Sequence, residues 1–151
     1  MSKLVYMSTL NQDHRDALEQ ILFFNANQSR SSAAVELVAK LYGVPRIQLV
    51  GDRLSVDLAS TTQSQTLFAV MRKGAVDHPA GVAVFTREDD AFVVLFVAVH
   101  EKFSSRGKQA KARVLMHMTN EVKAIARRVK GVSCLRVYLG RPEPIRLRVD
   151  K

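Results

Sequence analysis

Hydrophobic residues along the chain change their spacing twice, and each change predicts a different kind of element. Over 14–26 and again over 31–42, apolar residues recur three or four positions apart, which is typical of helices with one buried face. From 46 to 99 they alternate with polar residues or gather in short runs between turn residues, which is typical of strands. Helical spacing returns over 108–129. The pattern therefore predicts two helices, a set of strands and a long final helix.

Short apolar runs give the positions of the expected strands. These runs lie at 3–7, 47–50, 54–58, 66–71, 80–85, 91–99, 132–139 and 145–149. The run at 91–99 is apolar almost throughout, so it is expected at the centre of a sheet with both faces buried. The runs from 66 to 99 predict an antiparallel meander with 73–79 as its first turn, and those on either side of Gly51 predict a hairpin. Because the long helix separates 91–99 from 132–139, these two strands are expected to be parallel.

Each helical pattern also predicts which side chains face the core. In the first helix the buried face is expected to hold Ala17, Ile21 and Phe24, with Leu18 and Leu22 beside them. In the long helix the stripe that faces the sheet is expected to be Leu115, Met118, Val122, Ile125 and Val129. Gly43 and Gly131 follow the second and the long helix, where glycine commonly ends a helix.

Length and composition limit the chain to one domain. Of its 151 residues, 47% are hydrophobic and 25% are charged. This is enough for one packed domain over 1–151, and it excludes a disordered, fibrous or disulfide-stabilised protein. We expect an α+β fold with a mostly antiparallel mixed sheet and flanking helices. No apolar run reaches the roughly 20 residues of a membrane span, and the N-terminus lacks the apolar core of a secretory signal, so a cytoplasmic protein is expected.

The cysteine and the histidines do not form a pattern of metal ligands. Cys134, the one cysteine, lies in an apolar run, where a buried reduced thiol is the plainer interpretation and a nucleophile is the alternative. His14, His78 and His117 lie on different predicted elements and lack the spacing of zinc ligands. No metal site is therefore expected.

Positive charge is concentrated in the last third of the chain. Residues 1–100 carry a net charge of −1, and residues 101–151 carry a net charge of +10. Such a surface attracts polyanions, so nucleic acid and an acidic protein are both candidate partners, and a solvated basic surface is the alternative. The candidate contacts are Lys102, Arg113, Lys123, Arg127 and Arg128. Few aromatic residues accompany them, which favours contacts to phosphate over stacking on bases.

A strand, a loop and a helix in the second half of the chain resemble the cofactor-binding part of a known family. The strand ends in Val97-Ala98-Val99, the loop reads Arg106-Gly107-Lys108-Gln109-Ala110-Lys111, and Val114-Leu115 follow on the helix. With the order of elements over 66–139, these segments resemble the GNAT superfamily of N-acetyltransferases. The family's loop has Arg or Gln, two variable residues, Gly, one variable residue, and Gly or Ala. Gln109 and Lys111 stand where the family has its two signature glycines.

The resemblance implies acetyl-CoA as the cofactor and assigns residues to its site. The implied cofactor-binding residues are Ala98, Val99, Arg106, Gly107, Lys108, Gln109, Ala110 and Lys111. Backbone N–H groups at the start of the helix would meet the pyrophosphate, with Lys108 and Lys111 as additional cations. His100 and Glu101 lie beside this site at the end of the strand and are the candidate general bases. Tyr138 lies upstream of the family's proton-donating tyrosine, so no general acid is predicted.

Two functions are compatible with these features. The resemblance implies an acyl-CoA-dependent N-acyltransferase that transfers an acetyl group to an amine of a small molecule or a protein. The alternative is a non-catalytic protein of acetyltransferase-like fold that binds nucleic acid or an acidic protein through its basic last third. A homodimer is a further prediction, because the final strand at 145–149 offers an edge to a second copy.

Overall fold

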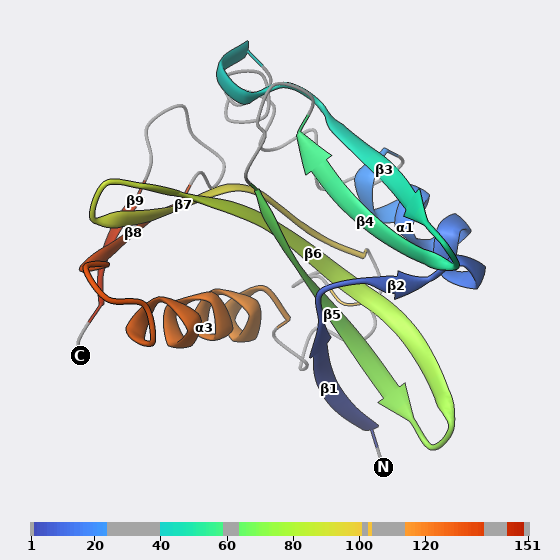
Figure 1. The fold of residues 1–151 in the computed structure, drawn as a ribbon. Helices are drawn as coiled ribbons and strands as arrows, with labels where there is room; N and C mark the ends of the chain where they lie inside the picture. The colour runs from blue at the N-terminus through green and yellow to red at the C-terminus, as the bar shows by residue number, and fades with distance from the viewer. Residues whose placement is uncertain are drawn as a thin grey trace.

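The computed structural model describes residues 2–23, 40–58, 64–100, 103, 114–137 and 145–149. It has an α+β architecture in which helices flank both faces of a six-stranded sheet (Figure 1). The elements in chain order are β1 (Ser2–Met7), β2 (Leu10–Asn11), the 3₁₀ turn η1 (Gln12–His14), α1 (Arg15–Leu22), β3 (Pro45–Val50), β4 (Arg53–Leu58), β5 (Gln65–Lys73), β6 (Val76–Glu88), β7 (Ala91–Val99), α3 (Val114–Arg127), β8 (Cys134–Val137) and β9 (Ile145–Arg148).

The larger sheet is mixed, and its parallel pair involves the long buried strand β7. The strand order is β1-β5-β6-β7-β8-β9. β7 runs parallel to β8, and every other described pair in this sheet is antiparallel. The predicted meander is therefore confirmed as β5–β6–β7, and the predicted parallel pair is confirmed on either side of α3. This is the α+β class with a mostly antiparallel mixed sheet that the sequence predicts.

The predicted hairpin around Gly51 belongs to a second, smaller sheet. β3 and β4 form the hairpin, and Gly51 has a φ of 63°, a left-handed conformation that glycine adopts without strain. β4 also pairs with the short strand β2, which gives the order β2-β4-β3. Figure 1 shows this sheet and α1 on the side of the larger sheet opposite α3.

Two hydrophobic cores lie on the two faces of the larger sheet. One core contains α3, and the other contains α1 and the inner face of the smaller sheet. β7 contributes to both, since Val94 faces α3 and Val93 faces α1. Its burial on both faces is as predicted. Cys134 is buried at 4% exposure on β8, which confirms the buried thiol.

The buried face of α3 differs by one residue from the predicted stripe. Leu115 is 42% exposed, whereas its neighbour Val114 is fully buried. The residues that face the sheet recur every four positions: Val114, Met118, Val122 and Ala126. The predicted Ile125 and Val129 pack at the margin of this stripe. Two adjacent stripes of this helix are apolar, so contact with the sheet decides which one is buried.

The buried face of α1 agrees with the prediction except at Ala17. Leu18, Ile21 and Leu22 are buried, and Ala17 is only half-buried. Phe24 lies outside the described residues. The second helix is described only at residues 40–42, and it ends as predicted at Gly43, which has a φ of 99°. None of the described helices is long and apolar enough to cross a membrane.

The first turn of the meander is shorter than predicted. The sequence predicts a turn over 73–79, but β6 begins directly after the two turn residues Gly74 and Ala75. Pro79 therefore lies within β6, next to Ala80, which is an extra residue in the pairing of β6 with β5. A strand accepts proline at such a bulge because the regular ladder of hydrogen bonds is already interrupted there.

Gly81 allows α3 to pack closely on the centre of the sheet. A Cβ atom at this position would lie 2.7 Å from the Met118 Sδ and 3.3 Å from the Val114 Cγ1. It would also lie 3.1 Å from the carbonyl oxygen of Ala98 on the neighbouring strand. The absence of a side chain at Gly81 therefore sets the distance between the helix and the sheet.

The substitution Gly81→Ala is expected to destabilise the protein by about 1–3 kcal/mol, because an added methyl group overpacks this contact. The measurement is the free energy of unfolding in urea. Replacing Met118 by Ala in the same chain removes the closest clash, so the double variant is expected to be less destabilised than the two single effects combined. Strict additivity would contradict the contact.

Candidate functional site

The described pairing of β7 with β8 covers only the first half of β7. The parallel pairing begins at Ala91 and ends where Val94 lies opposite Val137. From Leu95 onward, β7 pairs only with β6 among the residues that the structure describes. Among the described residues, the second half of β7, which we call the open edge of β7, therefore has a neighbouring strand on one side only. Residues 138–144, which follow β8, lie outside the described residues.

A β-bulge in β7 directly follows the last described pair of β7 and β8. Val84 pairs with Phe96 and Phe85 pairs with Val94, so Leu95 is an extra residue in β7. Leu95 and Phe96 consequently both face the core that contains α1, although consecutive residues of a regular strand face opposite sides. A bulge changes the direction of the backbone groups that follow it, and bulges are frequent beside active sites.

The backbone of Val97 faces the open edge. The N–H of His100 donates to the carbonyl oxygen of Ala80 at 2.7 Å. Because backbone groups alternate in direction along an antiparallel strand, Ala98 also turns its N–H and C=O toward β6, and Val97 turns its own away. An N–H group that a sheet holds in this way is a preorganised donor for an incoming carbonyl or anion.

The strand-end residues predicted from the sequence lie at this edge. Ala98 and Val99 are buried at the end of β7 and face opposite cores. His100 is half-buried, and its carbonyl oxygen accepts a hydrogen bond from the N–H of Phe103 at 2.8 Å. The two rings meet edge to face with their centroids 6.3 Å apart. These contacts hold His100 in a turn at the end of the open edge.

The other residues predicted for the cofactor and the general base lie outside the described residues. They are Glu101, Arg106, Gly107, Lys108, Gln109, Ala110 and Lys111. Lys102, Arg113 and Tyr138 are likewise not described. Their assignments therefore stay predictions.

The described basic residues of the predicted partner surface lie toward the C-terminal end of α3. Arg127 and Arg128 are exposed, and Lys123 is half-buried one turn earlier. Val114, the first described residue of the helix, is about 20 Å from Arg127 at 1.5 Å per residue. Cations near the C-terminus of a helix interact favourably with its dipole, which gives Arg127 and Arg128 a structural role. The structure does not gather these residues beside the open edge of β7.

Tyr6 on β1 is a partly buried polar residue that the sequence analysis did not single out. Burial raises the pKa of its hydroxyl, and the negative charge of Glu121 on α3 raises this pKa further. β1 lies three strands from β7, which is about 14 Å at the usual spacing of strands. Tyr6 therefore lies where β1 contacts α3, too far from the open edge of β7 to act there as a general acid.

The substitution Glu121→Gln is expected to lower the pKa of Tyr6 toward the ordinary value without restoring it, because burial is the larger cause of the shift. The measurement is a titration of tyrosinate absorbance, with Tyr6→Phe identifying the contribution of this residue. An unchanged pKa would contradict the placement of Glu121 beside Tyr6.

Polar side chains from three segments form a cluster at the end of β6, beside β8. Glu88 at the end of β6 accepts a hydrogen bond from the Tyr42 hydroxyl at 2.9 Å. Its second oxygen lies 2.7 Å from the Nη2 of Arg136 on β8. Spacing in the sequence gave no signal for this cluster, since its members lie 46 and 48 residues apart. It fastens helical residues 40–42 to the sheet.

The comparison with solved structures gives a structural likeness, whereas the comparisons of sequence give no match. No protein-family model matches the chain, and no curated protein sequence matches it. A crystal structure of nourseothricin acetyltransferase is similar over 89% of this chain and 72% of its own, with 17% sequence identity and a TM-score of 0.38. A likeness of this size decides nothing about activity. A function can be proposed only from the arrangement of the strands.

Proposed function

We propose that this chain is an acyl-CoA-dependent N-acyltransferase whose site is the open edge of β7. One observation carries the proposal: the bulge at Leu95 directly follows Val94, the last residue of β7 with a described partner on β8. After the bulge, the backbone groups of β7 that point away from β6 would be available to a ligand. The acyl acceptor is an amine of a small molecule or a protein.

The residues at this edge fit the extended arm of coenzyme A. The pantetheine arm contains amide groups, and an extended amide chain can pair with an exposed strand edge as a further strand would. The N–H and C=O of Val97 are directed toward such a chain. The side chains of Ala98 and Val99 are buried in the two cores and hold this part of the backbone in place. The loop residues 106–111 would hold the phosphates.

The chain's own part in the reaction is to position an amine and to move a proton. Coenzyme A supplies an acyl group activated as a thioester. The backbone N–H of Val97 is a donor for the carbonyl oxygen as negative charge develops on it. His100 or Glu101 accepts a proton from the attacking ammonium group. Most of the rate enhancement comes from holding the amine against the acyl carbon.

Acetyl-CoA is expected to bind the purified chain with a dissociation constant in the micromolar range, which corresponds to about −8 kcal/mol. Isothermal titration at low and high salt measures it, with desulfo-CoA as an unreactive analogue. The double variant Lys108→Glu/Lys111→Glu is expected to weaken binding by about tenfold or more, because it places negative charge beside the phosphates.

The matched control reverses two charges at the opposite edge of the sheet. Lys3→Glu/Lys73→Glu changes the net charge by the same amount, on exposed residues of β1 and β5, and is expected to leave binding unchanged. Equal losses in the two double variants, or only a salt-sensitive millimolar association, would contradict a cofactor site. The second outcome would favour the non-catalytic binding protein instead.

The substitution His100→Ala is expected to lower kcat by about 100-fold or more while the KM for acetyl-CoA stays nearly constant, because a general base acts in the transition state. The measurement is release of free thiol with a panel of amines. The fall in activity at acidic pH should disappear in this variant. If Glu101→Gln removes that fall and His100→Ala does not, the proton acceptor is Glu101.

A further inference from the structure

Among the described residues, the outer edge of β9 has neither a strand partner nor a counter-charge. β9 is the last strand of the larger sheet, and no described residue pairs with its outer edge. Arg146 and Arg148 are exposed, and neither forms a hydrogen bond or an ion pair within the part of the chain that the structure describes. This site is distinct from the open edge of β7, since β8 lies between them.

The same two arginines carry the outward-facing backbone groups. The N–H of Val149 donates to the carbonyl oxygen of Ser133 at 2.9 Å, in register with the pairing of β9 and β8. The direction of the backbone N–H and C=O groups alternates along an antiparallel strand, so those of Leu147 also point toward β8. Arg146 and Arg148 therefore turn their N–H and C=O groups away from the sheet. Each offers a donor and an acceptor to a further strand.

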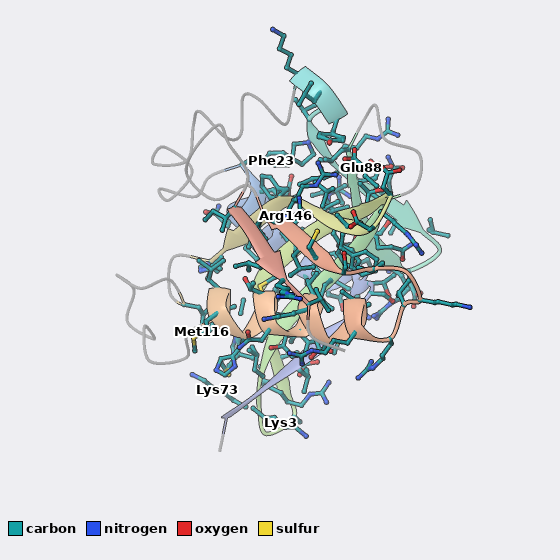
Figure 2. The ribbon with its side chains drawn as sticks, turned by 90° about the vertical axis from the view of Figure 1, so that its left-hand side faces the viewer. Lys3, Phe23, Lys73, Glu88, Met116 and Arg146 are labelled. Carbon is teal, nitrogen blue, oxygen red and sulfur yellow. The ribbon has the colours of Figure 1, made fainter. Side chains whose placement is uncertain are left out.

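The side chains of these arginines project from the face opposite α3. Leu147 packs against the core that contains α3, and alternate residues of a strand lie on opposite faces. Figure 2 views β8 and β9 from the front, with Arg146 labelled above α3. Arg136 on β8 lies on the same face, where its guanidinium reaches Glu88. Three arginines thus share one face of two adjacent strands.

Like charges are held close together at this face. Arg136 and Arg146 are direct cross-strand partners, and they form the closer, non-hydrogen-bonded type of pair, with Cα atoms about 4.5 Å apart. Such a pair is unfavourable without an anion. Glu88 compensates Arg136, but the Nε of Arg136 is buried with no hydrogen-bond partner among the described residues. Among the described residues, Glu88 is the one carboxylate paired with any of these three arginines.

We propose that β9 binds an extended acidic peptide of a partner protein as an additional antiparallel strand. Acidic side chains at alternate positions of that peptide would lie opposite Arg146 and Arg148, where opposite charges in cross-strand pairs are stabilising. The residues between them would be apolar and would extend the surface of Ile145 and Leu147, which are half-buried. Backbone hydrogen bonds supply affinity, and the alternation of side chains supplies specificity.

Neither a second copy of this chain nor a nucleic acid uses all of these features. Pairing of β9 with β9 of another copy would set arginine against arginine, which disfavours that form of the predicted homodimer. A nucleic acid would use the charge of the arginines but leave the outward N–H and C=O groups of Arg146 and Arg148 without a matched strand. An acidic strand would pair with the arginine side chains and also with these backbone groups.

The experiment compares two fluorescent peptides of identical composition on the full chain. The probe is Glu-Val-Glu-Thr-Glu-Val with capped ends, and the control is Glu-Glu-Glu-Val-Val-Thr, in which acidic residues do not alternate. Anisotropy is expected to show tighter binding of the alternating peptide. Arg146→Glu/Arg148→Glu is expected to weaken it by about tenfold or more, whereas Lys3→Glu/Lys73→Glu leaves it unchanged. Arg146→Gln/Arg148→Gln tests the same charges with less perturbation.

Amide hydrogen exchange separates strand addition from contact through charge alone. The backbone amides of Arg146 and Arg148 face outward, so they are expected to exchange fast in the free chain and slowly with the alternating peptide. Unchanged exchange, equal affinity for both peptides, or no binding would overturn the proposal. Tighter binding of a single-stranded oligonucleotide that both arginine variants abolish would overturn it as well. Melting temperatures of the variants verify that they are folded.

Discussion

The fold depends on β7, because this strand contributes side chains to both hydrophobic cores. Its residues are apolar almost throughout, and they alternate between the core under α3 and the core under α1. A strand buried on both faces needs covering layers on both sides, and the two helices together with the smaller sheet provide them. The positions of α1, α3 and the neighbouring strands are therefore set relative to β7.

The bulge at Leu95 turns this buried strand into a candidate site. Within a regular ladder every backbone group of a central strand is paired, and nothing remains for a ligand. The extra residue places Leu95 and Phe96 on one face and follows the last described pair with β8, so the residues after it have a described neighbour on one side only. Burial keeps the strand in place while its open edge presents backbone groups, which is the combination that a rigid binding site requires.

The fold divides the positive charge of the last third into separate places. Arg127 and Arg128 lie at the end of α3, where they complement the helix dipole. Arg146 and Arg148 lie on the outer strand, on the face away from α3. The net charge of the last third of the sequence suggests a single basic surface. In the structure, α3 and β9 place these arginines beside different neighbours. At β9 the arginine side chains lie beside backbone N–H and C=O groups that face away from the sheet, whereas the arginines on α3 do not.

The sequence by itself determined the kinds of element, their order and the parallel pairing of β7 with β8, because these follow from local spacing and from the length of the connecting helix. It also located Ala98, Val99 and His100 at the end of the buried strand. Only the tertiary structure decided which apolar stripe α3 buries, where the β7 ladder shifts at Leu95, and that Glu88 meets Arg136. These features depend on contacts between residues that are far apart in the chain, and such contacts leave no periodic signal in the sequence. The outward direction of Arg146 was decided in the same way, since it follows from the pairing of β9 with β8.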